Sequence, residues 1–143
     1  MEADMTSMPV QSDDELASIL GQNRIAVVGC STTEGKAAHE VPKYLQERGF
    51  EIVPVNPFAE EVLGEPAYDS VTAVPGTVDV VDVFRPSEEV PEILDAVLDR
   101  DDEPVLWLQL GIEHEAAADR AEAAGLTVVQ DRCMKIEHKR LNA

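Results

Sequence analysis

The sequence predicts a three-layer α/β fold, in which helices cover both faces of a five-stranded parallel sheet. Two observations lead to this class. Short, Val-rich apolar stretches alternate five times with helical patterns, as strand–helix–strand crossovers do. The stretches are apolar at consecutive positions, which indicates strands buried on both faces. Because such crossovers are right-handed, we expect a doubly wound sheet with the strand order 3-2-1-4-5 and a switch point between its first and fourth strands.

The domain boundary follows from the first polar stretch. Residues 1–11 are expected to form a flexible N-terminal tail, which leaves residues 12–143 as a single domain. Ser12 and Glu15 have the spacing of a capping box, which predicts a short helix that ends near Gly21. The strands then follow at about residues 24–30, 51–55, 78–84, 105–109 and 126–130.

Later helices have their own start and stop signals. Pro42 should fall in the first turn of its helix, where a missing N–H does no harm, and Gly49 should end that helix. Ser87 is expected to cap the next helix, and Gly125 to end an Ala- and Glu-rich one. The loop over residues 58–76 is expected to have little regular structure. The helices after the first cover about residues 38–48, 87–99, 113–124 and 134–141.

Length and cysteine content set further limits. A chain of 143 residues can bury a full core without staples. No apolar run approaches the roughly 18 residues of a membrane span, and the N-terminus lacks the basic and apolar regions of a signal peptide. We therefore expect a cytoplasmic protein with no membrane partner. By their number and spacing, Cys30 and Cys133 make neither a disulfide framework nor a metal site.

The charge balance is strongly acidic. The chain has 29 Asp and Glu against 11 Lys and Arg, a net charge of −18, together with 44% hydrophobic residues. Such a chain folds, so the acid must coat its surface. We expect a halophilic setting, because this self-repulsion is tolerable where salt screens it. A nucleic-acid partner is not expected, since duplex binding needs a basic face.

The end of the first strand is the first candidate ligand site. Four apolar residues lead into Gly29, and a helical pattern resumes at about Ala38, so a glycine-bearing turn meets a helix N-terminus. Such a turn can hold the phosphates of a nucleotide-like ligand, or it can be an ordinary strand–helix turn. Ligands of doubly wound sheets lie outside the carboxyl ends of the strands. The segments expected there are Gly29-Cys30-Ser31, Asn56-Pro57, Phe84-Arg85, Gln109-Leu110-Gly111 and Cys133.

Two features oppose a dinucleotide ligand. The turn from Gly29 to Gly35 does not match the Gly-x-Gly-x-x-Gly pattern. The second strand ends in Asn56-Pro57, without the acidic residue that holds the ribose hydroxyls of NAD. We also expect no second domain that would bring a substrate to a nicotinamide.

Five motifs follow one another in register along the chain. They are Val27-Val28-Gly29-Cys30-Ser31, Pro54-Val55-Asn56-Pro57, Val81-Asp82-Val83-Phe84-Arg85, Trp107-Leu108-Gln109-Leu110-Gly111 and the segment from Asp131 to His138. Together these motifs resemble the small, stand-alone CoA-binding proteins, which are similar to the N-terminal domain of the succinyl-CoA synthetase alpha subunit. The resemblance covers about residues 15–141 and implies a Rossmann-like, nucleotide-binding fold that binds coenzyme A at the switch point.

Candidate contacts to the nucleotide half follow from this placement. Ser31 offers a hydroxyl and a backbone N–H to phosphate, and it resembles the family's serine. Lys36 would supply charge to the pyrophosphate or 3′-phosphate. Arg85 is either an anion contact or the partner of a surface acid. Asn56 and Pro57 lie where adenine or ribose would be, although Asn-Pro is also a common turn.

Candidate contacts to the pantetheine half lie further along the chain. Gln109 and Gly111 are expected to face Gly29 across the switch point, and their loop resembles the synthetase loop that receives pantetheine. Phe84 packs against the ligand or in the core. Cys133 could form a mixed disulfide with the CoA thiol or be a small buried residue, whereas Cys30 should be buried and inert.

The three histidines are expected to be structural, and Trp107 to be a core residue. We therefore expect a protein that binds coenzyme A or an acyl-CoA and performs no chemistry by itself. The alternatives are a CoA-sensing regulatory module that acts on a partner protein, and a subunit of a nucleotide-dependent acyl-CoA ligase or oxidoreductase. A protein partner, a homo-oligomer and the identity of any acyl group are left open.

Overall fold

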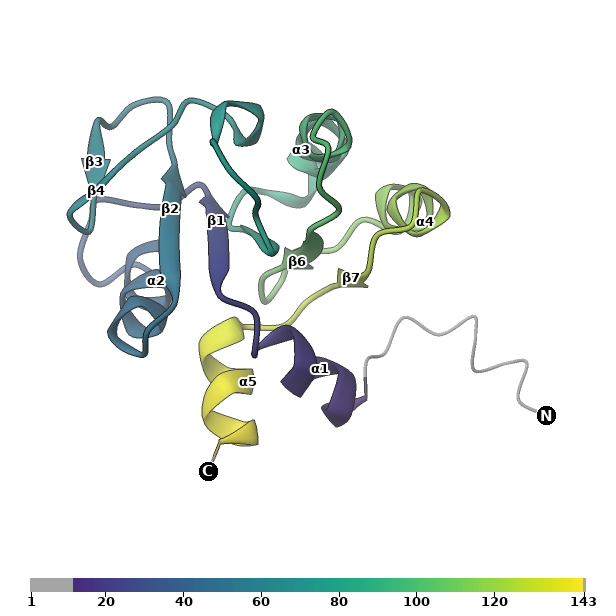
Figure 1. The fold of residues 1–143 in the computed structure, drawn as a ribbon, viewed down its shortest axis with the longest axis horizontal. Helices are drawn as coiled ribbons and strands as arrows, with labels where there is room; N and C mark the ends of the chain where they lie inside the picture. The colour runs from purple at the N-terminus through teal and green to yellow at the C-terminus, as the bar shows by residue number, and fades with distance from the viewer. Residues whose placement is uncertain (1–11, 143) are drawn as a thin grey trace.

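A computed structural model describes residues 12–142 of the chain (Figure 1). The expected tail, residues 1–11, lies outside the described residues. One five-stranded sheet has the order β2-β1-β5-β6-β7, and every neighbouring pair is parallel. This confirms the three-layer α/β class. The strands are β1 (Arg24–Val28), β2 (Glu51–Val55), β5 (Val80–Val83), β6 (Val105–Leu108) and β7 (Val128–Val129).

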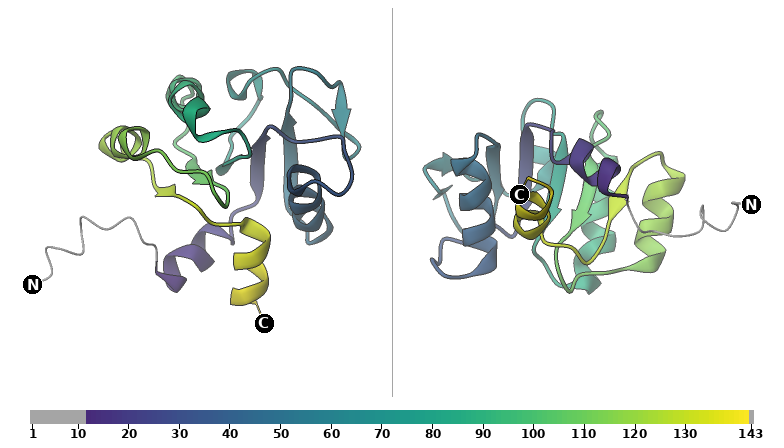
Figure 2. Two further views of the ribbon diagram at one scale, coloured as in Figure 1. Left: turned by 180° about the vertical axis from the view of Figure 1, so that it is seen from behind. Right: turned by 90° about the horizontal axis from the view of Figure 1, so that it is seen from below.

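The helices form a layer on each face of the sheet (Figures 1 and 2). One hydrophobic cluster joins the sheet to the first, second and last helices, and another joins its opposite face to the two helices between them. Trp107 of β6 is fully buried, as expected for a core residue, and its indole Nε1 donates to the Arg132 carbonyl at 2.8 Å. The helices are α1 (Asp13–Ile19), α2 (Ala37–Glu47), α3 (Val90–Leu98), α4 (Glu115–Ala123) and α5 (Met134–Leu141).

The expected strand order was wrong. Counted along the chain, the five strands of this sheet lie in the order 2-1-3-4-5, and not 3-2-1-4-5, because β5 pairs with β1. Pro54 explains the edge position of β2. Its carbonyl points away from β1 and accepts from Tyr68 N–H at 3.0 Å, so its ring nitrogen also faces that side. A central strand would need an N–H there, which proline lacks. The switch point therefore lies between β1 and β5.

The loop over residues 58–76 is more ordered than expected. It contains a small antiparallel hairpin, β3 (Glu61–Val62) with β4 (Glu65–Pro66), and a 3₁₀ helix, η2 (Val71–Ala73). An isolated parallel bridge between Val55 and Tyr68 covers the outer edge of β2. The loop thus covers the outer edge of β2, where Pro54 has no N–H to offer another strand.

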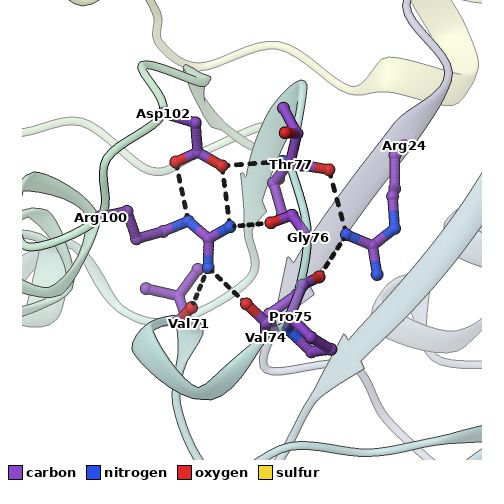
Figure 3. Close-up of polar contacts among 9 residues, drawn as sticks. Arg24, Val71, Val74, Pro75, Gly76, Thr77, Arg100 and Asp102 are labelled. Atoms are coloured by element: carbon purple, nitrogen blue, oxygen red, sulfur yellow. Dashed lines mark hydrogen bonds and ion pairs between the residues drawn. The ribbon is translucent and has the colours of Figure 1, made fainter.

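Two arginines hold the end of this loop (Figure 3). Arg100, which lies after α3, donates to three backbone carbonyls at 2.7–2.9 Å and forms a two-bonded pair with Asp102 at 2.8 and 2.9 Å. Arg24 donates to two further carbonyls at 2.6 and 3.0 Å. Four of these five carbonyls lie outside helices and strands, and the fifth lies at the start of η2, so side chains supply their donors. They belong to Val71, Val74, Pro75, Gly76 and Thr77.

The two predicted N-cap serines have different outcomes. The capping box is present, because the Ser12 hydroxyl accepts from Glu15 N–H at 3.1 Å and Ser12 N–H donates to the Glu15 carboxylate at 2.9 Å. Ser87 does not cap α3. It lies in a 3₁₀ turn, η3 (Ser87–Glu89), and its hydroxyl accepts from Glu113 N–H at 3.1 Å, which ties two loops together. Across residues 12–142, every helix is too short or too polar to cross a membrane.

Candidate functional site

A cleft of about 810 Å³ opens where β1, β2 and β5 end, beside α3. It lies at the β1/β5 switch point, which is the position that doubly wound sheets use for ligands. The lining includes the tips of the three strands, the start of α2 and one side of α3. The predicted site residues among them are Gly29, Cys30, Ser31, Lys36, Asn56, Pro57, Phe84 and Arg85.

Gly29 is required by its conformation and by its neighbour. Its φ of 85° is a left-handed value that favours glycine. A Cβ atom at this position would lie 2.8 Å from Cδ of Arg85, closer than carbon atoms approach. The Gly29 N–H donates to the Val55 carbonyl at 2.9 Å. This glycine therefore lets the Arg85 side chain cross the end of β1.

Ser31 is already hydrogen-bonded within the protein. Its N–H donates to the Ala38 carbonyl at 3.0 Å, and its hydroxyl accepts from Thr33 N–H at 2.9 Å. Pro42 explains the first bond. It is the sixth residue of α2, not in the first turn as expected, and its missing N–H leaves the Ala38 carbonyl without its helical donor. The serine thus braces the strand–helix turn.

A carboxylate of the protein lies inside this turn. Glu40 Oε2 accepts from Gly35 N–H and lies next to His39 Nδ1, both at 3.0 Å. These hydrogen bonds lower the pKa of Glu40. Lys36 is the N-cap residue of α2, and its side chain makes no capping bond. In the expected phosphate cradle, at least one backbone donor is therefore bound to an internal anion.

Lys36 and Arg85 are the cationic side chains among the described residues that line the cleft. Arg85 forms a two-bonded ion pair with Glu89, with Nε–Oε1 at 3.0 Å and Nη2–Oε2 at 2.8 Å. This pairing raises the pKa of Arg85 and lowers that of Glu89. Asp69 and Glu92 also line the cleft. A local positive group is thus present but is neutralised by the protein's own acid.

Asn56 shapes the exit from β2. Its Nδ2 donates to the Cys30 carbonyl at 2.9 Å, and its Oδ1 accepts from Phe58 N–H at 2.8 Å. Phe58 lines the mouth of the cleft and is 96% exposed. Sequence reasoning missed this residue. The signal was an aromatic directly after an Asn-Pro turn, in a chain with only 4% aromatic residues.

Two buried groups lie near the cleft. Cys30 is fully buried, as predicted, and burial together with the charge of Asp82 raises its pKa to about 12. Asp82 lies in β5 between Val27 and Trp107 of the neighbouring strands. Its carboxyl is fully buried, neither oxygen has a hydrogen-bond partner among the described residues, and burial raises its pKa well above the ordinary value.

Gln109, Gly111 and Cys133 do not line the cleft. Gln109 and Gly111 were expected to face Gly29. They do not, because β5 separates β6 from β1. The Gln109 Oε1 accepts from Met134 N–H at 3.2 Å, and Gly111 N–H donates to Asp131 at 2.6 Å. Cys133 is half-buried at the N-terminus of α5. A ligand contact by these three residues stays a prediction.

Each histidine has a partner inside the protein. His114 caps α4, with Nδ1 accepting from Ala117 N–H at 3.1 Å. His138 Nδ1 lies 2.8 Å from the Tyr44 hydroxyl, and its ring meets those of Tyr44 and Phe50 edge-on. His39 lies against the Glu40 carboxylate. These contacts are the kind expected of structural histidines.

Comparisons with known proteins give consistent results. Residues 23–139 match the protein family described as a CoA binding domain. The chain is similar to YneT of Bacillus subtilis, with 41% identity over 128 residues that cover 89% of this chain and 94% of YneT. It is also similar to subunit alpha of the ADP-forming acetate–CoA ligase II of Pyrococcus furiosus, with 31% identity over 131 residues, 83% of this chain and 29% of that subunit. A solved structure of a hypothetical protein from Pyrococcus horikoshii superposes with a TM-score of 0.90 at 36% identity, covering 95% of this chain and 96% of the other.

Proposed function

We propose that this chain, which belongs to the CoA binding domain family, binds coenzyme A or an acyl-CoA in the cleft at the ends of β1, β2 and β5. The family membership confirms the resemblance seen in the sequence motifs. The observation that carries the proposal is the cleft itself, because it gathers predicted contacts from three strands at the switch point. Its volume of about 810 Å³ lies within the usual range of roughly 300–1,000 Å³ for ligand pockets.

The residues fit a phosphate-bearing ligand through side chains more than through backbone. Gly29, Ser31 and Gly35 all donate their N–H groups within the protein. Arg85 presents a planar fork that suits two phosphate oxygens, and Glu89 now accepts from that fork in the same two-bonded way. Lys36 adds a second charge at the start of α2. Binding would thus exchange one anion for another at Arg85.

The exit from β2 disfavours a dinucleotide. An NAD site needs an acid there to accept from the ribose hydroxyls. Asn56 stands in that place, and its side-chain oxygen and nitrogen are both bonded within the protein. These internal bonds of Asn56 support the proposal that the site prefers CoA to NAD.

Titration calorimetry in molar salt tests the ligand class. The purified chain should bind CoA and show no comparable heat with NAD at the same concentration. Adenosine 3′,5′-bisphosphate, the nucleotide end of CoA, should bind more weakly than CoA but measurably. NAD binding as tight as CoA binding, or no binding of CoA at all, would contradict the proposal.

A second candidate is a subunit role in acyl-CoA synthesis. The ADP-forming acetate–CoA ligases that the chain matches are longer, and the chain spans 12% to 29% of their length. In this role the chain holds CoA while a partner supplies the nucleotide chemistry. Native size-exclusion fractions in high salt should then contain a larger assembly that forms acetyl-CoA from acetate, ATP and CoA. A CoA-loaded chain that elutes alone, with no activity in any fraction holding it, would reject this candidate.

A further inference from the structure

Phe58 is an apolar ring held out at the mouth of the cleft. At 96% exposed it is the most exposed large hydrophobic side chain in residues 12–142. Exposed apolar area costs about 25 cal/mol per Å², so this ring is in an unfavourable position that a flat apolar partner would relieve. Its position in the cleft lining indicates that this partner is the ligand.

The backbone of Phe58 is fixed by the turn that precedes it. Asn56 Oδ1 accepts from Phe58 N–H at 2.8 Å, and the Asn56 carbonyl accepts from Ala59 N–H at 3.3 Å. On its other side, Asn56 Nδ2 donates to the Cys30 carbonyl at the end of β1 at 2.9 Å. The Asn56 side chain therefore ties the backbone of Phe58 to the segment that follows β1. A ring presented in this way is less costly to order on binding than one on a loose loop.

The location selects which part of CoA the ring would meet. In doubly wound folds, the end of the second strand lies beside the ribose of a bound adenine nucleotide. Arg85, at the end of β5, is the cation at the switch point where phosphates lie. Adenine is flat and aromatic, and every base has a π-face on which a phenyl ring can stack.

We propose that Phe58 stacks on the adenine of the ligand and that Asn56 is its positioning residue. This inference rests on the proposed function and adds the residue that recognises the base. The sequence suggested Asn56 itself as the base contact. In this proposal Phe58 contacts the base, and Asn56 holds Phe58 in place. A protein surface that covers Phe58 is the competing occupant, and ligand fragments with and without the base separate the two.

Binding of three ligands to the full chain tests the proposal. CoA carries both adenine and pantetheine, adenosine 3′,5′-bisphosphate carries the base alone, and 4′-phosphopantetheine lacks the base. Phe58→Ala should weaken binding of the first two by roughly tenfold and leave 4′-phosphopantetheine unchanged. Phe58→Trp should preserve or strengthen CoA binding. Leu98→Ala, an exposed apolar residue outside the cleft lining, is the matched control and should change nothing.

Fluorescence and a double substitution give independent readouts. In Phe58→Trp, CoA should quench the added indole, and 4′-phosphopantetheine should not. Asn56→Ala should weaken CoA binding by several-fold, and adding it to Phe58→Ala should have almost no further effect, because both act through one ring. If wild type binds CoA and Phe58→Ala binds it equally well, the stacking proposal is wrong and the proposed function stands. If wild type binds none of the three ligands, the proposed function itself fails.

Discussion

Two arginines in this fold are used in opposite ways. Arg100 is 7% exposed, and its donors are bound to three fixed backbone carbonyls and to Asp102 (Figure 3). Arg85 is 48% exposed and is held by one flexible side chain, Glu89. Carbonyls of the main chain cannot leave without unfolding the loop, whereas a glutamate can swing away. The exchangeability of the partner, and not the number of bonds, therefore makes Arg85 the arginine we propose for ligand binding and Arg100 a structural one.

Substituting Arg100 should give the largest effect. Arg100→Met removes the guanidinium donors from three carbonyls and the charge partner from Asp102, which keeps a bond from Val78 N–H. The free energy of unfolding should therefore fall by about 3 to 5 kcal/mol. Arg100→Lys should recover only part of this, because a point charge cannot reach all of the acceptors. Urea unfolding followed by circular dichroism measures the change. If the free energy of unfolding fell by less than about 1 kcal/mol, the net contribution of one ordinary hydrogen bond, the loop would keep its conformation without Arg100.

Substituting Arg85 should separate binding from stability. Arg85→Gln should weaken CoA binding by tenfold or more, since charge-assisted hydrogen bonds contribute about 1.5–3 kcal/mol. The free energy of unfolding should change by less than about 1 kcal/mol, because the ion pair is exposed. Arg120→Gln is the control, since Arg120 pairs with Asp95 outside the cleft. Equal affinities in both variants and wild type would show that Arg85 does not contact the ligand.

Asp82 extends the comparison to a buried charge-bearing group with no partner among the described residues. Its pKa is raised in the folded chain and ordinary in the unfolded one, so between these two values the folded state holds a proton that the unfolded state releases. The free energy of unfolding should therefore fall as pH rises through this window. Asp82→Asn should remove that slope and be more stable than wild type at neutral pH, with the difference shrinking toward pH 4.

Urea unfolding across pH values checks the sign of this effect. Asp119→Asn, which alters an exposed carboxyl, should leave the slope unchanged. If the free energy of unfolding rose from pH 4 to 8 by the same amount in wild type and in Asp82→Asn, Asp82 would not titrate as its burial requires.

Glu89 should give the smallest effect, with the opposite sign. Glu89→Gln removes the anion that competes for Arg85, so CoA binding should tighten by about two- to fivefold. Glu92→Gln is the matched control, because Glu92 lines the same cleft and forms no ion pair within residues 12–142. Calorimetry should show a larger increase in CoA affinity for Glu89→Gln than for Glu92→Gln. Identical gains would point to general charge repulsion and not to exchange at Arg85.

Sequence reasoning reached the fold class and most of the cleft for one physical reason. Consecutive apolar residues identify buried strands, and the carboxyl ends of parallel strands share one edge whatever their order. Gly29, Asn56 and Arg85 therefore come together even though the expected order was wrong. The order itself depends on Pro54, because a strand that lacks this N–H belongs at the edge of a sheet.

The state of each site residue could not be read in the same way. Ser31 is engaged because Pro42 frees a carbonyl, and Arg85 because η3 brings Glu89, four residues further along the chain, to its guanidinium. The Asn56 amide bonds to a carbonyl 26 positions earlier in the chain, which depends on the β1–β2 register. Patterns of residue type locate such groups, but only packing decides which donors remain for a ligand.

Val71 connects the cleft to the loop that Arg100 holds. Its side chain is buried and lines the cleft, and its carbonyl accepts from Arg100 at 2.7 Å on the far side of the same loop. One wall of the cleft is therefore ordered when the chain folds, and its conformational entropy is not lost again when a ligand arrives. Under the proposed function, Arg100, which lies outside the cleft lining, would therefore reduce the conformational entropy that is lost on binding.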